Sequence, residues 1–136
     1  MLGDVDASQA IAELTDISPQ VRSVVVIEAG GALGGTNLAA EDAARRLADG
    51  AQRLLEAADA VRPGVAQLEA ATTSGSVFVV RDGERAIAAT TTADPTVGLV
   101  FYDLKTCLRS IEPPTPRRRK AAPAPAKEKE ADDAAA

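Results

Sequence analysis

The chain has 136 residues, enough for one domain with a hydrophobic core but not for two. It contains no run of 18 or more apolar residues, so we expect no integral contact with a membrane. Its opening residues also lack the basic and apolar pattern of a secretory signal. One cysteine cannot form an internal disulfide, which fits the cytoplasmic location that we expect.

The charge of the chain is divided unevenly. Residues 1–112 carry nine basic and sixteen acidic side chains, whereas residues 113–136 carry six and four. An acidic body disfavours nonspecific binding to nucleic acid, and the three aromatic side chains are too few for base-stacking platforms. We therefore expect no specific nucleic-acid partner.

The first predicted element is a short helix over residues 6–17. Asp6 is placed to cap it, and Gln9 stands at the capping-box position. Pro19 disfavours helical geometry in the residue before it and ends the helix. Four apolar side chains share one face at helical spacing, and we expect them to be buried: Ala10, Ile11, Leu14 and Ile17.

Two strands follow this helix. Residues 21–28 contain an uninterrupted apolar run, which is typical of a strand covered on both faces. After a turn at residues 29–31, residues 32–36 return as a shorter strand. Gly34 and Gly35 weaken that strand and mark a site for a β-bulge.

The longest predicted helix spans residues 38–60. Thr36 or Asn37 is placed to cap it. Its apolar stripe covers an arc of roughly 140°, wide enough to contact more than one surface. The stripe consists of Ala40, Ala43, Ala44, Leu47, Ala48, Ala51, Leu54, Leu55 and Ala58.

A third strand is predicted at residues 65–72, followed by a hairpin at residues 76–92. Val77–Val80 and Ala86–Ala89 form two apolar runs, and Asp82-Gly83 between them suits a tight turn. Because neither run alternates with polar residues, both strands should be covered on both faces.

The last predicted helix is opened by Asp94 as the cap and Pro95 at the first helical position. Gly98 would allow close approach to the sheet, and residues 112–114 end the helix. The buried stripe is predicted to be Val97, Val100, Phe101, Leu104, Cys107, Leu108 and Ile111. The prolines, alanines and charges of residues 113–136 predict a disordered tail.

Together these elements predict an α+β fold for residues 1–112, in the order helix, two strands, helix, three strands, helix. We expect a five-stranded, mostly antiparallel sheet. The long helix should cover one face and the other two helices the opposite face.

The sequence offers no catalytic, cofactor or metal site. It lacks histidine, and Cys107 falls on a buried stripe. The glycine-rich segment from Gly30 to Gly35 invites comparison with a phosphate loop, but Thr36 stands where the lysine belongs, which favours a hairpin turn.

One basic cluster could contact anionic lipid, RNA or an acidic protein, although a solubilising role is favoured because the acidic residues that follow dilute it. The cluster is Arg117, Arg118, Arg119 and Lys120.

The hairpin string GSVFVVRDGERAIAATT and the helix string DPTVGLVFYDLKTCLRSI carry a resemblance. Together with the opening helix-strand-turn-strand segment, they resemble the bacterial roadblock (dynein light-chain-like) domain family. The likeness is greatest to actinobacterial members described as predicted regulators of Ras-like GTPases, and it covers residues 5–112.

The resemblance implies a homodimer in which the long helices pack together and the sheets join. It also implies a non-enzymatic adaptor that tethers a small Ras-like GTPase or stimulates its GTP hydrolysis. It does not single out an arginine finger among Arg45, Arg46 and Arg53. The implied interface consists of Leu47, Ala51, Leu54, Leu55 and Ala58 on the helix, with Gln67 and Glu69 on the strand at residues 65–72.

Two alternative functions remain. Related sheet-and-helix folds enclose small ligands, so the domain could be a sensory module, although few aromatic or buried polar groups support this. The second alternative is that the protein is a scaffold that binds acidic surfaces through its basic tail.

Overall fold

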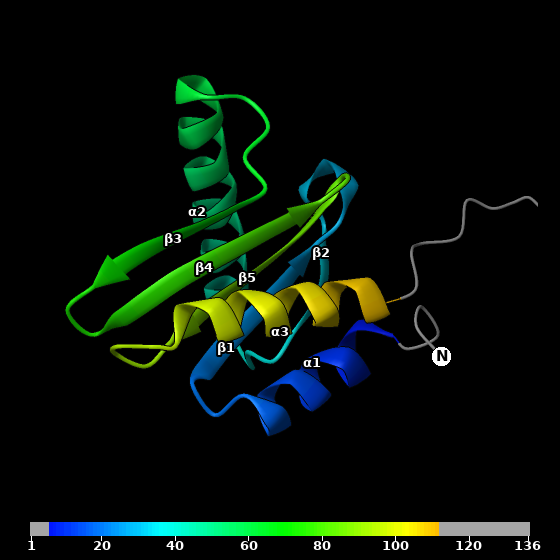
Figure 1. Ribbon diagram of the computed structural model, residues 1–136. Helices are drawn as coiled ribbons and strands as arrows, with labels where there is room; N and C mark the ends of the chain where they lie inside the picture. The colour runs from blue at the N-terminus through cyan, green and yellow to red at the C-terminus, as the bar shows by residue number, and fades with distance from the viewer. Residues whose placement is uncertain (1–5, 112–136) are drawn as a thin grey trace, which may run out of the picture.

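The computed structural model describes residues 6–111 and contains one sheet between two helical layers (Figure 1). The predicted order of elements is confirmed, with a 3₁₀ turn added at Ala29–Gly31. The predicted tail, with Arg117–Lys120, lies outside the described residues. The elements are α1 (Ala7–Ile17), β1 (Val21–Ile27), β2 (Leu33–Thr36), α2 (Glu41–Val61), β3 (Gln67–Thr72), β4 (Gly75–Asp82), β5 (Arg85–Thr91) and α3 (Val97–Ser110).

The five strands lie in the order β2-β1-β5-β4-β3, and every pairing is antiparallel. Three central strands therefore have two neighbours each, while β2 and β3 form the edges. Asp82 pairs with Arg85 across the β4–β5 hairpin. The two central turn residues are thus Gly83 and Glu84 rather than the expected Asp82 and Gly83. Gly83 supplies the positive φ, at 66°.

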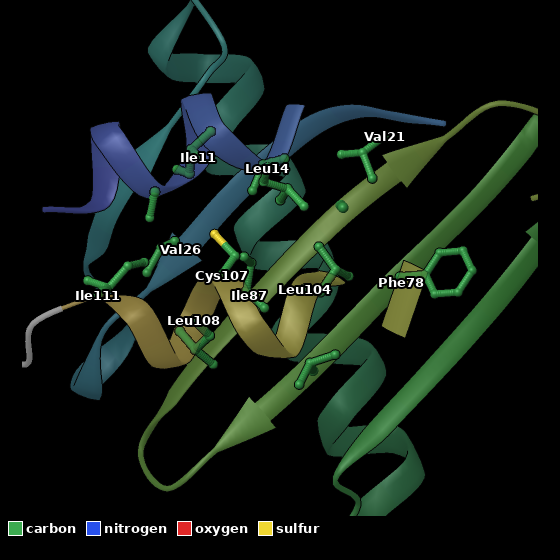
Figure 2. Close-up of a cluster of buried hydrophobic side chains, with 14 of the residues drawn as sticks. Ile11, Leu14, Val21, Val26, Phe78, Ile87, Leu104, Cys107, Leu108 and Ile111 are labelled. Carbon is green, nitrogen blue, oxygen red and sulfur yellow. The ribbon is translucent and has the colours of Figure 1, made fainter. Parts of the chain in front are cut away.

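The sheet is covered on both faces, as the non-alternating strands predicted. The helix α2 packs on one face, whereas α1 and α3 pack on the other (Figure 1). Ile11 and Leu14 of α1 belong to the same buried cluster as Leu104 and Leu108 of α3, and Figure 2 shows these side chains on one face of the sheet. This arrangement confirms the predicted α+β fold.

The first helix is capped as expected, because Asp6 Oδ1 accepts a hydrogen bond from the Gln9 N–H at 2.8 Å. The expected burial of Ile17 is wrong, since this side chain is 66% exposed. Ile17 is the last helical residue and lies at the rim of a hollow between α1 and α3.

The predicted caps of the other two helices are wrong. The side chains of Thr36 and Asn37 form hydrogen bonds with the backbone of β1 instead. Val24 N–H donates to Asn37 Oδ1 at 2.8 Å, and Thr36 Oγ1 donates to Val24 O at 2.7 Å. The helix α2 starts only at Glu41, without a side-chain cap. Asp94 has a φ of 54° and does not cap α3, which starts two residues later than expected.

Two glycines of β2 sit where side chains would collide. The β1–β2 register shifts opposite Gly34, which confirms the expected bulge. A Cβ at Gly35 would lie 2.6 Å from the Ala7 Cβ, so this glycine lets α1 approach the edge of the sheet. The expected role of Gly98 is wrong, because no atom lies within 4 Å of its added Cβ, and Val97 beside it is 39% exposed.

We expect Gly75→Ala to destabilise the fold by about 2 kcal/mol or more, because this is the cost range of strained backbone and overpacking. Gly75 has a φ of 155°, and its added Cβ would collide with the Thr91 carbonyl oxygen. The matched control Gly98→Ala should stabilise by about 0.5–1 kcal/mol, since alanine is the better helix former. Urea unfolding of both variants measures the contrast, and equal effects would contradict it.

Candidate functional site

An apolar groove runs along the outer side of α2 beside β4. Its volume is about 390 Å³. Leu47 and Leu54 lie one above the other on the helix, and Val77 of β4 lies opposite them. The full lining is Arg46, Leu47, Gly50, Ala51, Arg53, Leu54 and Val77. An apolar groove between charged rims is typical of a protein contact.

The breadth of the α2 stripe explains why the groove exists. One part of the stripe is buried against the helix's own sheet, at Ala44, Ala48, Ala51 and Leu55. Leu47, Leu54 and Ala58 flank this buried row and remain half-buried. Among the α2 residues that the resemblance implied for an interface, these three are therefore the ones with surface left to bury.

The edge strand β3 continues this surface. Leu68 and Ala70 face the α2 side, since their β4 partners Val79 and Val77 pack there. Gln67 and Glu69 point to the opposite side and are exposed. Ser76 Oγ donates to Glu69 Oε2 at 2.9 Å, which holds that carboxylate on its own sheet. The outer backbone groups of an edge strand are available to another strand.

An ion pair that the sequence pattern did not reveal fastens the loop before β3. Arg81 Nη2 donates to Asp59 Oδ1 at 2.9 Å and to the Val65 carbonyl at 2.6 Å. The same Asp59 oxygen accepts from the Val65 N–H at 3.0 Å. Asp59 and Arg81 are far apart in sequence and lie on different elements, so no periodicity links them.

We expect the Asp59–Arg81 ion pair to make the free energy of unfolding depend on pH in the acidic range. The hydrogen bond from Arg81, with that from the Val65 N–H, lowers the pKa of Asp59 below its ordinary value of 3.8. The ionised Asp59 therefore contributes fully to the free energy of unfolding above its ordinary pKa. This contribution is lost as the pH falls through the lowered pKa of the folded state. Urea unfolding of Asp59→Asn against the wild type should show a difference at pH 6 that shrinks below about pH 3.8. A difference that is constant with pH would contradict this.

The three arginines considered for a catalytic role lie in two places. Arg46 and Arg53 line the rim of the α2 groove. Arg45 instead donates to the Gly31 carbonyl at 3.2 Å and braces the 3₁₀ turn against α2. Only Arg46 and Arg53 are therefore positioned to meet a partner at the groove.

The single cysteine of the chain lies in the hydrophobic core. Cys107 is buried, as expected, and burial with the nearby Glu13 charge raises the pKa of its thiol to about 12. Within residues 6–111, no group of acidic, cysteine or histidine side chains is arranged to hold a metal ion. No helix in this range has the length and apolar character to cross a membrane.

Comparison with solved structures identifies the fold. Two structures of a roadblock/LC7 domain from Streptomyces avermitilis superpose with TM-scores of 0.69 and 0.63, at 18% and 21% identity. They cover 78% and 76% of this chain and 94% and 95% of the solved chains. Myxococcus xanthus MglB follows with a TM-score of 0.59, at 14% identity, covering 74% of this chain and 87% of that chain.

The protein thus has the roadblock/LC7 fold, which confirms the structural expectation drawn from the hairpin and helix strings. No protein-family model matches the sequence. No curated protein matches it either.

Proposed function

We propose that the protein is a homodimeric, non-enzymatic adaptor that binds a small Ras-like GTPase. The α2 groove carries the dimeric part of this proposal, because Leu47 and Leu54 are apolar, partly exposed and placed on one line. In a twofold interface the same groove is used by both copies, so its two leucines would pack against those of a second chain.

The edge strand β3 would give the proposed dimer a second contact. The strand β3 lies at the sheet edge, next to β4, whose Val77 lines the groove. Pairing of two β3 strands would join the sheets and satisfy both free edges. Helix packing and strand pairing would then bury one continuous surface.

The GTPase part of the proposal rests on the resemblance of residues 5–112 to predicted regulators of Ras-like GTPases. The presence of MglB among the structural neighbours fits a roadblock-type regulator. The small-ligand alternative has less support, because buried apolar side chains from both helical layers pack against the sheet.

The experiment is affinity capture by the tagged full chain from a lysate of its host. A non-hydrolysable GTP analogue is compared with GDP, and the captured proteins are read by mass spectrometry. We expect nucleotide-dependent recovery of a small Ras-like GTPase, and direct binding by the purified GTPase should reproduce it. Recovery of the protein alone with either nucleotide would remove the GTPase assignment.

A hydrolysis assay with the purified GTPase then separates activation from tethering. Arg46→Ala and Arg53→Ala test the two groove arginines, because an arginine that stabilises the transition state contributes roughly 10³–10⁵-fold to the rate. Arg62→Ala, at an exposed site beyond the end of α2, is the matched control. If neither groove variant reduces a measured acceleration, these arginines do not activate the GTPase.

A further inference from the structure

A second hollow lies between α1 and α3, on the opposite side of the molecule from the α2 groove. Its volume is about 180 Å³. Ala10 and Leu14 contribute apolar lining from α1, and Cys107 contributes it from α3. Glu13 on one helix and Asp103 on the other add two carboxylates. Figure 2 places Leu14 and Cys107 side by side between these two helices.

Asp103 is the unusual member of this hollow. It is only 8% exposed, and no described residue donates a hydrogen bond to its carboxylate or pairs with it. Glu13 is near enough for its charge to raise the pKa of the Cys107 thiol further. The hollow therefore concentrates negative charge over an apolar lining.

The basic residues of α3 lie away from this hollow. Arg109 Nε is 3.6 Å from Asp82 Oδ2 at the β4–β5 turn. Lys105 lines a separate depression over β4, together with Arg109. Of the residues that line the hollow itself, none is basic. A cation that enters it would meet two acidic groups without competition from its own walls.

The dimensions and chemistry select a cationic side chain. A volume of about 180 Å³ is below the roughly 300–1,000 Å³ of small-molecule sites. Arginine and lysine combine an apolar stem, which suits Ala10 and Leu14, with a charged head, which suits Asp103 and Glu13.

We propose that a basic side chain from the chain's own cluster, Arg117–Lys120, enters this hollow and holds the cluster there as an electrostatic latch across α1 and α3. Ser110, in the last turn of α3, lines the hollow, so the chain leaves the described fold beside it. Arg117 follows Ile111 by six residues, a reach of about 20 Å. Asp103 is about 10 Å back along the helix from Ser110. The latch needs no GTPase and is independent of the proposed adaptor function.

The test uses the full chain with a nitroxide spin label in the tail. Cys107→Ser removes the native thiol, and Ala121→Cys accepts the label next to the basic cluster. At low salt we expect backbone amides around the hollow, such as those of Glu13, Thr106 and Ser110, to lose roughly half of their intensity or more. Amides of α2 on the far face serve as the internal reference. Salt near 1 M, which shortens the screening length to about 3 Å, should restore the signals.

Matched variants decide whether the cluster and the hollow are responsible. Reversing the cluster with Arg117→Glu, Arg118→Glu, Arg119→Glu and Lys120→Glu should abolish the intensity loss. The distal control Lys127→Glu with Lys129→Glu should leave it unchanged, and Asp103→Asn should reduce it by at least about half, since one of the two facing carboxylates loses its charge.

Three results would overturn the latch. The first is an absence of intensity loss around the hollow at low salt. The second is equal loss in the charge-reversed chain. The third is the same loss in a mixture of isotope-labelled chain and separately spin-labelled chain, which would mean that another copy's tail fills the hollow.

Discussion

Leu54→Asp is expected to convert the proposed dimer into a monomer. Leu54 is partly exposed in the α2 groove and belongs to neither core cluster, so the substitution leaves the interior intact. A carboxylate buried in an apolar contact without a partner costs about 3–5 kcal/mol. Twofold symmetry places it in the interface twice. At 1.4 kcal/mol per tenfold change, dimer affinity should fall by at least about four orders of magnitude.

Sedimentation equilibrium of the wild type and variant measures this loss, with far-UV circular dichroism to show that both are folded. Leu99→Asp is the matched control, because Leu99 is a 48% exposed leucine on α3, across the sheet from the groove. The control should remain dimeric. A dimeric Leu54→Asp protein, or a monomeric wild type, would remove the α2 interface from the proposal.

The sequence predicted the fold well because its strongest signals are long apolar patterns. The runs at Val24–Ile27 and Ala86–Ala89 have no polar alternation, and both are buried between two helical layers. The long helix was recognised for the same reason. Helix starts were predicted poorly, because a side chain that can cap a helix can also form hydrogen bonds with a neighbouring strand. Thr36 and Asn37 are good caps in isolation, yet their side chains bond to β1, where they extend the β1–β2 pairing.

The candidate site was predicted only in part. The apolar stripe of a helix does not reveal which of its residues pack on the helix's own sheet and which remain available to line a groove. Leu55 and Leu54 are adjacent in sequence and both fall on the α2 stripe. Leu55 packs on the sheet of its own chain, whereas Leu54 lines the groove. The two side chains point in different directions from the helix, and only the position of the sheet decides which of them is buried. The hollow holding Asp103 was missed because it forms only when α1 and α3 meet. A lone aspartate on a helix predicts solvent exposure.

Phe78→Ala should be the most destabilising substitution in the core. Phe78 is completely buried on the α1/α3 face (Figure 2). Its ring meets that of Phe101 edge to face, with centroids 4.9 Å apart and an interplanar angle of 74°. Its partner on β5 is the small Ala89, so the ring fills space above the sheet that Ala89 does not reach. Truncation of a buried phenylalanine costs about 3–5 kcal/mol, and an aromatic pair adds about 0.5–1.5 kcal/mol.

That loss is comparable with the whole stability of an ordinary domain, about 5–15 kcal/mol, so the variant should unfold at much lower urea concentration. Phe78→Leu keeps most of the volume and should lose far less. Phe101→Ala removes the same ring contact from a half-buried position and should fall between the two. If Phe78→Ala cost no more than Phe101→Ala, the fold would depend on the pairing of the two rings rather than on the volume that Phe78 fills.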